Sequence, residues 1–261
     1  FVLNCEDDAL HSNGDILISG GSFRIASGDD GMHADGNLSI TAGTIEITES
    51  YEGIEGQSID ISGGTITLKA SDDGLNAAGG NDESGFGGFG GGFGQDMFAV
   101  DENAYIQISG GTLIIDASGD GIDSNGSITV SGGEVYVSGP VDGANGALDF
   151  ASEATISGGV FIAAGSSQMA ENFGTSSTQA SMLLTLSSQS AGTTITLTDG
   201  SGQTLVSFTA EKAFNSVVIS CPDLTVGETY TLSAGSYETD ISLSSLIYGS
   251  GQQMGGMPGS P

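Results

Sequence analysis

An acidic residue recurs at a nearly constant interval along the first 160 residues, in repeats that read D-G-I-x-x-x-G followed by a strand-like run and S-G-G. Successive intervals, by residue number, are 22, 22, 21, 47 and 22 for Asp8, Asp30, Glu52, Asp73, Asp120 and Asp142. The interval of 47 fits one repeat plus an insertion. Strand-rich repeats of this length are typical of stacked coils. The chain is therefore predicted to be all-β, with a parallel β-helix as its main body.

Stacking gives the repeated acid a physical consequence. Equivalent residues of neighbouring coils lie about 4.8 Å apart, so the acids form a column of like charges. Two unit charges about 5 Å apart repel by roughly 1 kcal/mol in water and by about 3 kcal/mol at an intermediate dielectric constant. We expect a positive species to occupy this column.

The charge balance narrows the possible partners. The chain has 33 Asp plus Glu against 3 Lys plus Arg, a formal net charge of −30. Nucleic-acid binding through basic patches is excluded, and an anionic membrane surface is an unfavourable partner. We expect no membrane insertion. Divalent cations can neutralise such an acidic surplus, so the composition favours an extracellular or cell-surface protein in a calcium-rich medium.

The repeat divides the chain into three parts. Residues 1–175 are predicted to form the β-helix, interrupted by a Gly- and Phe-rich insertion at 79–104 that either covers a ligand or packs on itself. Residues 176–248 lack the periodic acid and contain short strand-like runs such as M-L-L-T-L-S and T-T-I-T-L-T. They predict a small antiparallel β cap, since solenoid ends need covering. Residues 249–261 are low in complexity, as a disordered tail or linker would be.

Two cysteines stand far apart, Cys5 in the first coil and Cys221 near the C-terminal end. A disulfide between them would require the C-terminal segment to fold back along the whole stack, so we expect both thiols to be free and buried. Phe1 enters almost directly into a repeat, as expected for a piece of a longer precursor.

The repeated corners are rich in the hard oxygen ligands that calcium prefers, and calcium takes six to eight of them. Two carboxylates from one coil and one from the next could hold an ion, so several ions could follow one another along the stack. Three groupings are expected: Asp29 and Asp30 with Glu52 and Glu55; Glu52 and Glu55 with Asp72 and Asp73; and Asp120 and Asp123 with Asp142, beside Asn145. The alternative is a solvated acidic edge on which Asp and Asn only satisfy turns.

Other polar residues share these corners and are candidates for ligand binding: Asp8, His33, Asp35, Tyr51, Asn76 and Asn125. His11 and His33 occupy equivalent positions in the first two coils, which raises the question of zinc. Because neither has a cysteine neighbour and both lie among acids, we expect surface or stacking histidines.

The repeats resemble the bacterial secreted carbohydrate-binding domain-containing family. The similarity covers nearly the whole chain and lies in the following segments: D-D-G-M-H-A-D-G (29–36), E-S-Y-E-G-I-E-G (49–56), S-D-D-G-L-N-A-A-G-G (71–80), the Phe/Gly insertion, G-D-G-I-D-S-N-G (119–126), S-G-P-V-D-G-A-N-G-A-L-D-F (138–150) and G-E-T-Y-T-L (227–232). This resemblance implies a right-handed parallel β-helix that binds calcium and an acidic polysaccharide such as polygalacturonate, without catalysis.

Three functions remain open. A pectate-lyase-like enzyme needs a base, and the chain's only Lys and Arg residues are Arg24, Lys69 and Lys212. Paired acids could imitate a hydrolase, but basic residues to hold an acidic substrate are missing. A monomeric binding module, in which calcium bridges protein carboxylates to those of the glycan, is favoured, and no catalytic residue is predicted. A calcium-stiffened stalk or adhesin segment is the alternative.

Overall fold

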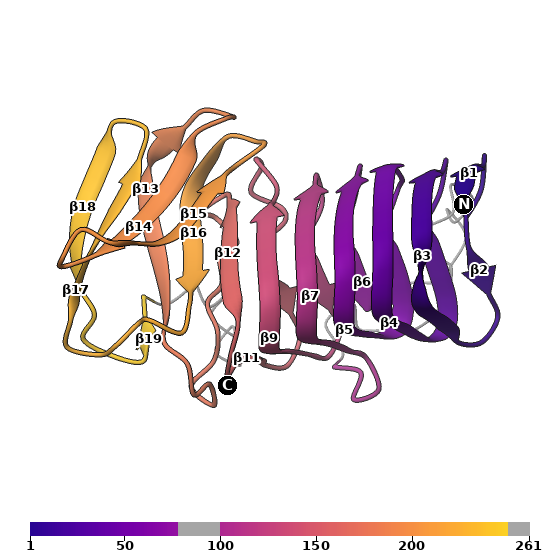
Figure 1. Ribbon diagram of the computed structural model, residues 1–261, viewed down its shortest axis with the longest axis horizontal. Helices are drawn as coiled ribbons and strands as arrows, with labels where there is room; N and C mark the ends of the chain where they lie inside the picture. Colours follow the sequence, from indigo (N-terminus) through magenta and orange to yellow (C-terminus); the bar gives the residue numbers. More distant parts are fainter. Residues whose placement is uncertain (78–99, 250–261) are drawn as a thin grey trace, which may run out of the picture.

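The computed structural model describes residues 1–77 and 100–249 of the chain, and its elements are all strands (Figure 1). The long strands of the stacked coils are β1 (Val2–Asn4), β3 (Ile16–Ala26), β4 (Met32–Glu49), β5 (Ile54–Ala70), β7 (Tyr105–Ala117), β9 (Ser127–Ser138) and β12 (Val160–Gly165). Shorter strands complete the coils: β2 (His11–Ser12), β6 (Leu75–Ala77), β8 (Ile122–Ser124), β10 (Asp149–Phe150) and β11 (Ala154–Ile156). Among the described residues there is no helix long and apolar enough to cross a membrane.

Neighbouring coils pair in parallel along one continuous sheet, in the order β1-β3-β4-β5-β7-β9-β12. The register follows the repeat, so that Ile18 faces Ile40, Ile40 faces Ile61, and Ile61 faces Ile108 across the insertion. The predicted parallel β-helix is confirmed. Residues 79–99 of the insertion and 250–261 of the tail lie outside the described residues.

Isoleucine columns fill the interior of the coils. Ile40, Ile61 and Ile108 are at most 1% exposed, and a parallel column runs through Ile47 and Leu68. Each fully buried side chain of this size contributes roughly 1.5–3 kcal/mol. The alternation of inward apolar and outward polar residues that the sequence displays is therefore the pattern that holds the coils together.

Glycine pairs make the corners between successive strands. The second glycine of the S-G-G motif has a positive φ in coil after coil, for example 95° at Gly64 and 87° at Gly111. A Cβ at Gly111 would lie 2.9 Å from the carbon of Gly63 and the oxygen of Gly64 in the coil before. Both the dihedral angle and the close stacking therefore require glycine here.

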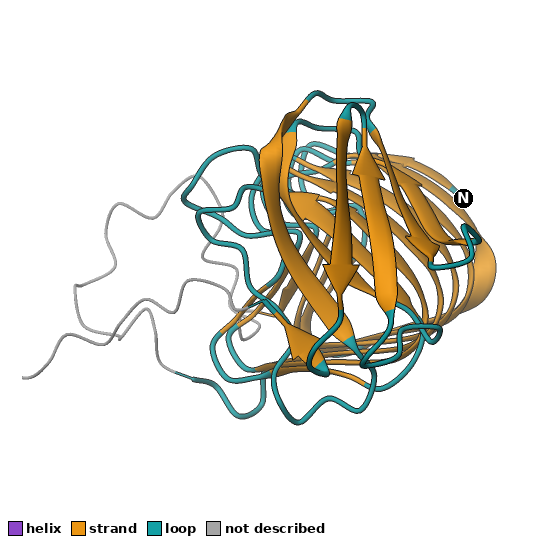
Figure 2. Ribbon diagram, turned by 90° about the vertical axis from the view of Figure 1, so that its left-hand side faces the viewer, coloured by secondary structure: helices purple, strands orange, loops and turns teal. Residues whose placement is uncertain are grey.

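The C-terminal part covers the end of the stack with the antiparallel strands β13 (Ser181–Gln189), β14 (Thr194–Asp199), β15 (Thr204–Thr209), β16 (Phe214–Ser220), β17 (Thr229–Ala234) and β18 (Tyr237–Ser242). The short strand β19 (Ile247–Tyr248) pairs in parallel with β13. Strand β16 pairs antiparallel with β12 and β13, so the sheet of the coils continues into the cap. A second sheet, β15-β14-β17-β18, packs as a separate layer (Figure 2). The predicted cap is confirmed. Cys5 and Cys221 are free thiols as expected, but only Cys221 is buried and the prediction of a buried Cys5 is wrong.

Candidate cation-binding site

Backbone hydrogen bonds between coils define a first column of residues at the acidic corner. The residue after each acid, a glycine except for Ala9, donates its N–H to the carbonyl of the residue that takes the place of the acid in the next coil, as from Gly31 to Glu52 and from Gly53 to Asp73. Followed along the stack, the first column consists of Asp8, Asp30, Glu52, Asp73, Asp120 and Gly146.

The prediction that Asp142 belongs to this column is wrong. Gly146 takes the position, 26 residues after Asp120, and its N–H is bonded by the Asp120 carboxylate. The last coil is longer than the regular coils without the insertion, and its extra residues form an exposed loop in which Asp142 Oδ1 accepts the N–H of Ala144 at 3.0 Å. A local turn therefore explains Asp142, and the neighbouring Asn145 lies in the same loop.

A second column runs beside the first, at the short strands of each corner. Strand register stacks His11 on His33, His33 on Glu55, and then continues through Asn76, Asp123 and Asp149. Asp149 was not among the predicted residues. The run A-L-D-F matches G-I-D-S at 121–124 once the longer last coil is allowed for, and that comparison would have identified it.

One oxygen of several first-column acids has a structural role. Asp8 Oδ1 accepts the N–H of Asp30 at 3.0 Å, Asp30 Oδ1 accepts that of Glu52 at 3.1 Å, and Asp73 Oδ1 accepts that of Asp120 at 2.6 Å. Burial of a backbone N–H without a partner is costly, so these acids stabilise the stack. These backbone contacts use one oxygen of each side chain, and the second oxygens of Asp8 and Asp30 contact His11 and His33.

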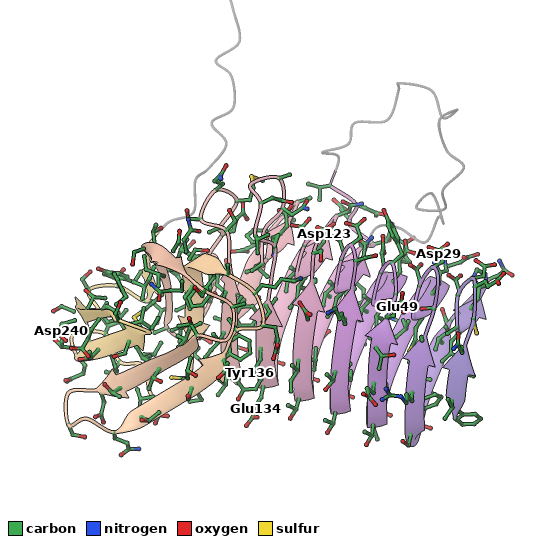
Figure 3. The ribbon with its side chains drawn as sticks, turned by 90° about the horizontal axis from the view of Figure 1, so that it is seen from above. Asp29, Glu49, Asp123, Glu134, Tyr136 and Asp240 are labelled. Atoms are coloured by element: carbon green, nitrogen blue, oxygen red, sulfur yellow. The ribbon has the colours of Figure 1, made fainter. Side chains whose placement is uncertain are left out.

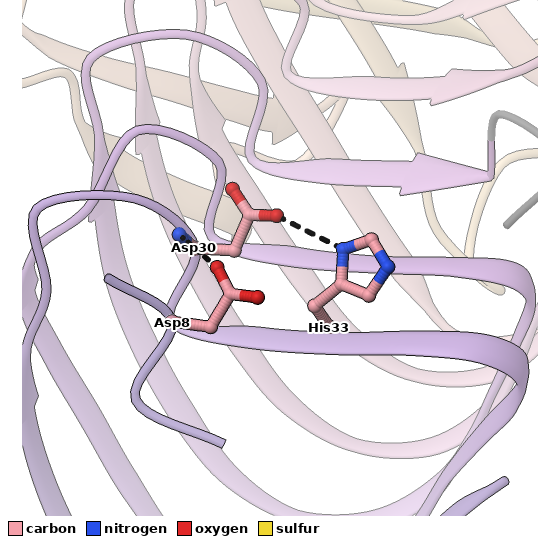
Figure 4. Close-up of side chains that lie close together, drawn as sticks. All are labelled: Asp8, Asp30 and His33. Atoms are coloured by element: carbon pink, nitrogen blue, oxygen red, sulfur yellow. Dashed lines mark hydrogen bonds and ion pairs between the residues drawn. The ribbon is translucent and has the colours of Figure 1, made fainter. Parts of the chain in front are cut away.

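His33 supplies positive charge to the N-terminal part of the columns. Its side chain is fully buried, and Nδ1 lies 3.2 Å from Asp30 Oδ2 (Figure 4). Nδ1 also lies 2.6 Å from Glu55 Oε2. The interaction with Asp30, and next the close carboxylate of Glu55, raise the pKa of His33 to about 11, against the opposing effect of burial. The stacking expected for the two histidines is confirmed, with ring centroids 5.0 Å apart, but His33 is not a surface residue.

Asp73, Asp120 and Asp123 form a cluster of a different kind, here called the three-aspartate cluster. One carboxylate oxygen of each lies within 4.8 Å of the others. Burial is the largest cause that raises the pKa of Asp73 to about 7 and those of Asp120 and Asp123 to about 8, and the mutual repulsion of these acids and Asp149 adds to it. Three partly buried carboxylates therefore share a space that favours a neutralising partner.

Asn76 adds an unsatisfied oxygen next to this cluster. Its Nδ2 donates to Glu52 Oε2 at 2.8 Å, which fixes the orientation of the amide. Its Oδ1 is buried without a hydrogen-bond partner, and Asn76 stacks directly on Asp123. A buried carbonyl oxygen of this kind is normally bonded to a donor or an ion. Together with the three aspartates it forms an all-oxygen donor set suited to a hard cation.

The chain's three basic side chains are committed elsewhere. Arg24 pairs with Glu46, and Lys69 and Lys212 both pair with Asp116, at 3.5 and 2.8 Å. Lys212 also donates to the carbonyl of Ala117. The three-aspartate cluster is therefore not neutralised by an Arg or Lys.

The other predicted residues lie in separate groups along the acidic corner. Asp30, Glu52 and Glu55 form a close group as expected, with the pKa of Glu52 raised to about 9 by burial first and by its acidic neighbours next. Asp29 instead gathers with Asp7 and Asp8. Asp35 contacts Nε2 of His33 at 3.3 Å, Tyr51 bonds to Asp72, and the Asn125 carbonyl accepts the N–H of Asp101. Asp29 and Asp123 lie toward the same long edge, opposite Glu134 (Figure 3).

The fold and the site define a class of protein: a capped parallel β-helix with buried, aligned acidic corners along one edge. Residues 1–88 match a family model described as Carbohydrate-binding domain-containing protein. This match supports a carbohydrate-binding role and is consistent with a protein that is not an enzyme. The matched segment contains both columns as far as Asn76, whereas Asp120, Asp123 and Asp149 lie beyond it. No curated protein and no solved structure matches the chain significantly.

Proposed function

We propose that the chain is a calcium-dependent carbohydrate-binding module that recognises an acidic polysaccharide such as polygalacturonate. The observation that carries the proposal is the three-aspartate cluster with the unpartnered Oδ1 of Asn76 beside it. Asp73, Asp120, Asp123 and Asn76 would hold the ion, which supplies the positive charge that the chain itself lacks there. A bound cation would let so acidic a protein associate with carboxylates of a glycan.

Calcium fits this donor set better than a transition metal. Each group offers a hard oxygen, and calcium accepts carboxylate, amide and backbone oxygens in flexible arrangements. Such sites in extracellular modules work at the high calcium concentrations found outside cells. We therefore propose an extracellular or cell-surface location and a monomer in solution, which size-exclusion chromatography with light scattering would test.

A second function is favoured by one specific observation, the burial of the cluster. Asp120 is only 9% exposed, so an ion held there could serve to stiffen the stack rather than to contact a sugar. In that case the chain would be a calcium-stabilised stalk or adhesin segment. The two functions differ in whether the ion changes affinity for a glycan.

Calorimetric titration of the EDTA-treated protein with calcium, repeated with polygalacturonate, separates them. The proposed module requires calcium binding and calcium-dependent glycan binding, both weakened in Asp123→Asn and unchanged in Asp142→Asn. Calcium binding without any glycan effect would leave the stiffened scaffold. No calcium binding by the wild-type protein would refute the ion site itself.

A further inference from the structure

The group around His33 offers a nitrogen atom as a possible metal ligand, whereas the three-aspartate cluster offers only oxygen atoms. The imidazole nitrogen Nδ1 faces two carboxylate oxygens, Asp30 Oδ2 at 3.2 Å and Glu55 Oε2 at 2.6 Å. All three side chains are at most 2% exposed. A nitrogen ligand between carboxylates suits a borderline transition metal better than it suits calcium, which takes oxygen ligands.

One proton cannot satisfy both carboxylates. Nδ1 makes its aligned hydrogen bond with Asp30, and the contact with Glu55 Oε2, although short, is not aligned as a hydrogen bond. Oε2 is therefore a buried oxygen without a hydrogen-bond partner, and it is directed at the ring nitrogen. Such an unsatisfied buried carboxylate oxygen needs a physical explanation.

A metal ion satisfies all three atoms at once. Zinc bonds to His nitrogen and to carboxylate oxygen at about 2.0–2.2 Å, so ligand atoms around one tetrahedral ion lie about 3.3–3.6 Å apart. The separation of 3.2 Å between Nδ1 and Asp30 Oδ2 is close to that value, and the separation of 2.6 Å between Nδ1 and Glu55 Oε2 would widen when the metal binds. Asp30 also lies close to Asp8, which offers a further carboxylate oxygen from the preceding coil (Figure 4).

We propose that Asp30, His33 and Glu55 form a second metal site, selective for a transition metal such as Zn²⁺ over Ca²⁺. In the metal-free protein the imidazole proton occupies this place, and zinc binding releases that proton. The site is separate from the three-aspartate cluster and does not depend on the proposed carbohydrate function.

The test uses the full chain without a polyhistidine tag, treated with EDTA and then titrated with Zn²⁺ in saturating Ca²⁺. We expect one equivalent of Zn²⁺ to bind, with proton release visible as a dependence of the heat on buffer ionisation. Loss of an outer-shell partner typically lowers metal affinity 10–100-fold, so loss of a ligand in His33→Asn should weaken binding by more than about 100-fold.

Control variants show whether a loss of zinc affinity is specific to the proposed ligands. Asp142→Asn removes a carboxylate that lies in the exposed loop of the last coil, outside both columns, and should change zinc affinity by less than about threefold. Asp123→Asn should likewise leave zinc binding intact while weakening calcium binding. Glu55→Gln keeps the size of the side chain and carries the test if circular dichroism shows that His33→Asn misfolds.

The proposal is overturned by three results: no zinc binding by the wild-type protein, zinc binding that calcium displaces, or zinc binding that survives in folded His33→Asn or Glu55→Gln. Substitution with Co²⁺ gives an independent readout, because His ligation alters the visible absorption of the bound ion. A spectrum that is the same in wild type and His33→Asn would also refute the assignment.

Discussion

Replacement of Asp123 by Asn should stabilise the protein in EDTA and remove most of the stabilisation that calcium confers. Asn keeps the shape of Asp and can still accept the N–H of Ser124, but it removes one of the three partly buried negative charges. Without a cation the charge is a cost, because burial and the neighbouring carboxylates of Asp73 and Asp149 disfavour ionisation. With calcium bound, the same charge is a ligand.

The magnitude follows from the pKa of Asp123, raised from 3.8 to about 8. Near pH 7 the unfolded chain has released this proton and the folded chain retains it. The cost at this pH is set by the interval of roughly three units between the unfolded pKa of 3.8 and pH 7. At about 1.36 kcal/mol per unit, burial of Asp123 costs up to about 4 kcal/mol of unfolding free energy that Asn avoids. For a protein of this size that corresponds to a rise in Tm on the order of 10 °C.

Thermal unfolding followed by circular dichroism, in EDTA and then in excess calcium, measures both effects. Wild type should gain about 2.7 kcal/mol when calcium reaches a hundred times its Kd, and Asp123→Asn should gain much less. Asp142→Asn is the matched control: its carboxylate is exposed in the long loop and bonded to Ala144, so its Tm should change little in either condition. Equal behaviour of the two variants, or a lower Tm for Asp123→Asn in EDTA, would contradict the electrostatic argument.

Three further predictions use the same melts. In EDTA the wild-type Tm should fall as pH rises from about 4 to about 8, because carboxyls with raised pKa values retain protons in the folded state that the unfolded state releases. Calcium should flatten this dependence of Tm on pH. A flat profile in EDTA would count against the buried cluster. Gly121→Ala should lower the free energy of unfolding by more than about 2 kcal/mol, since its Cβ would lie 2.4 Å from a backbone oxygen of the next coil. In the control Gly14→Ala, the new Cβ would meet only a side-chain oxygen at 3.9 Å, so the free energy of unfolding should change by less than about 0.5 kcal/mol. Lys212→Met should lower stability by about 1–3 kcal/mol, because the buried Asp116 carboxylate loses its closer partner, while Lys69→Met, at the same carboxylate but 67% exposed, should have little effect.

The repeat made the fold predictable, because inward Ile columns and corner glycines follow directly from a period in the low twenties. The error at Asp142 has a physical origin. Interval counting treats all coils as equal, yet the last coil is longer, and its corner is set by the stacking of Ala147 and Leu148 on Gly121 and Ile122 rather than by the nearest D-G. The exposed D-G at 142–143 is an ordinary turn that imitates the repeat.

The burial of His33 was not predictable in the same way. His11 and His33 occupy equivalent positions, but His33 lies between His11 and Glu55 and its Nδ1 faces the carboxylates of Asp30 and Glu55. The residues of the neighbouring coils, rather than the local motif, decide whether an imidazole is enclosed by carboxylates. Such neighbours cannot be read from the sequence of any single repeat.

The two columns have different roles, and this difference explains why the acidic corner could hold chemically different ions in different coils. The first-column aspartates each use one oxygen on the backbone of the next coil, so this column is constrained by folding and changes little. The second column has no such constraint and runs from His11 and His33 through Glu55 and Asn76 to Asp123 and Asp149. The second-column residue in each coil decides whether a proton, a borderline metal or a hard cation neutralises the first-column acids beside it. Exchange of Glu55 and Asn76 between levels should therefore move ion preference along the stack without disturbing the coils.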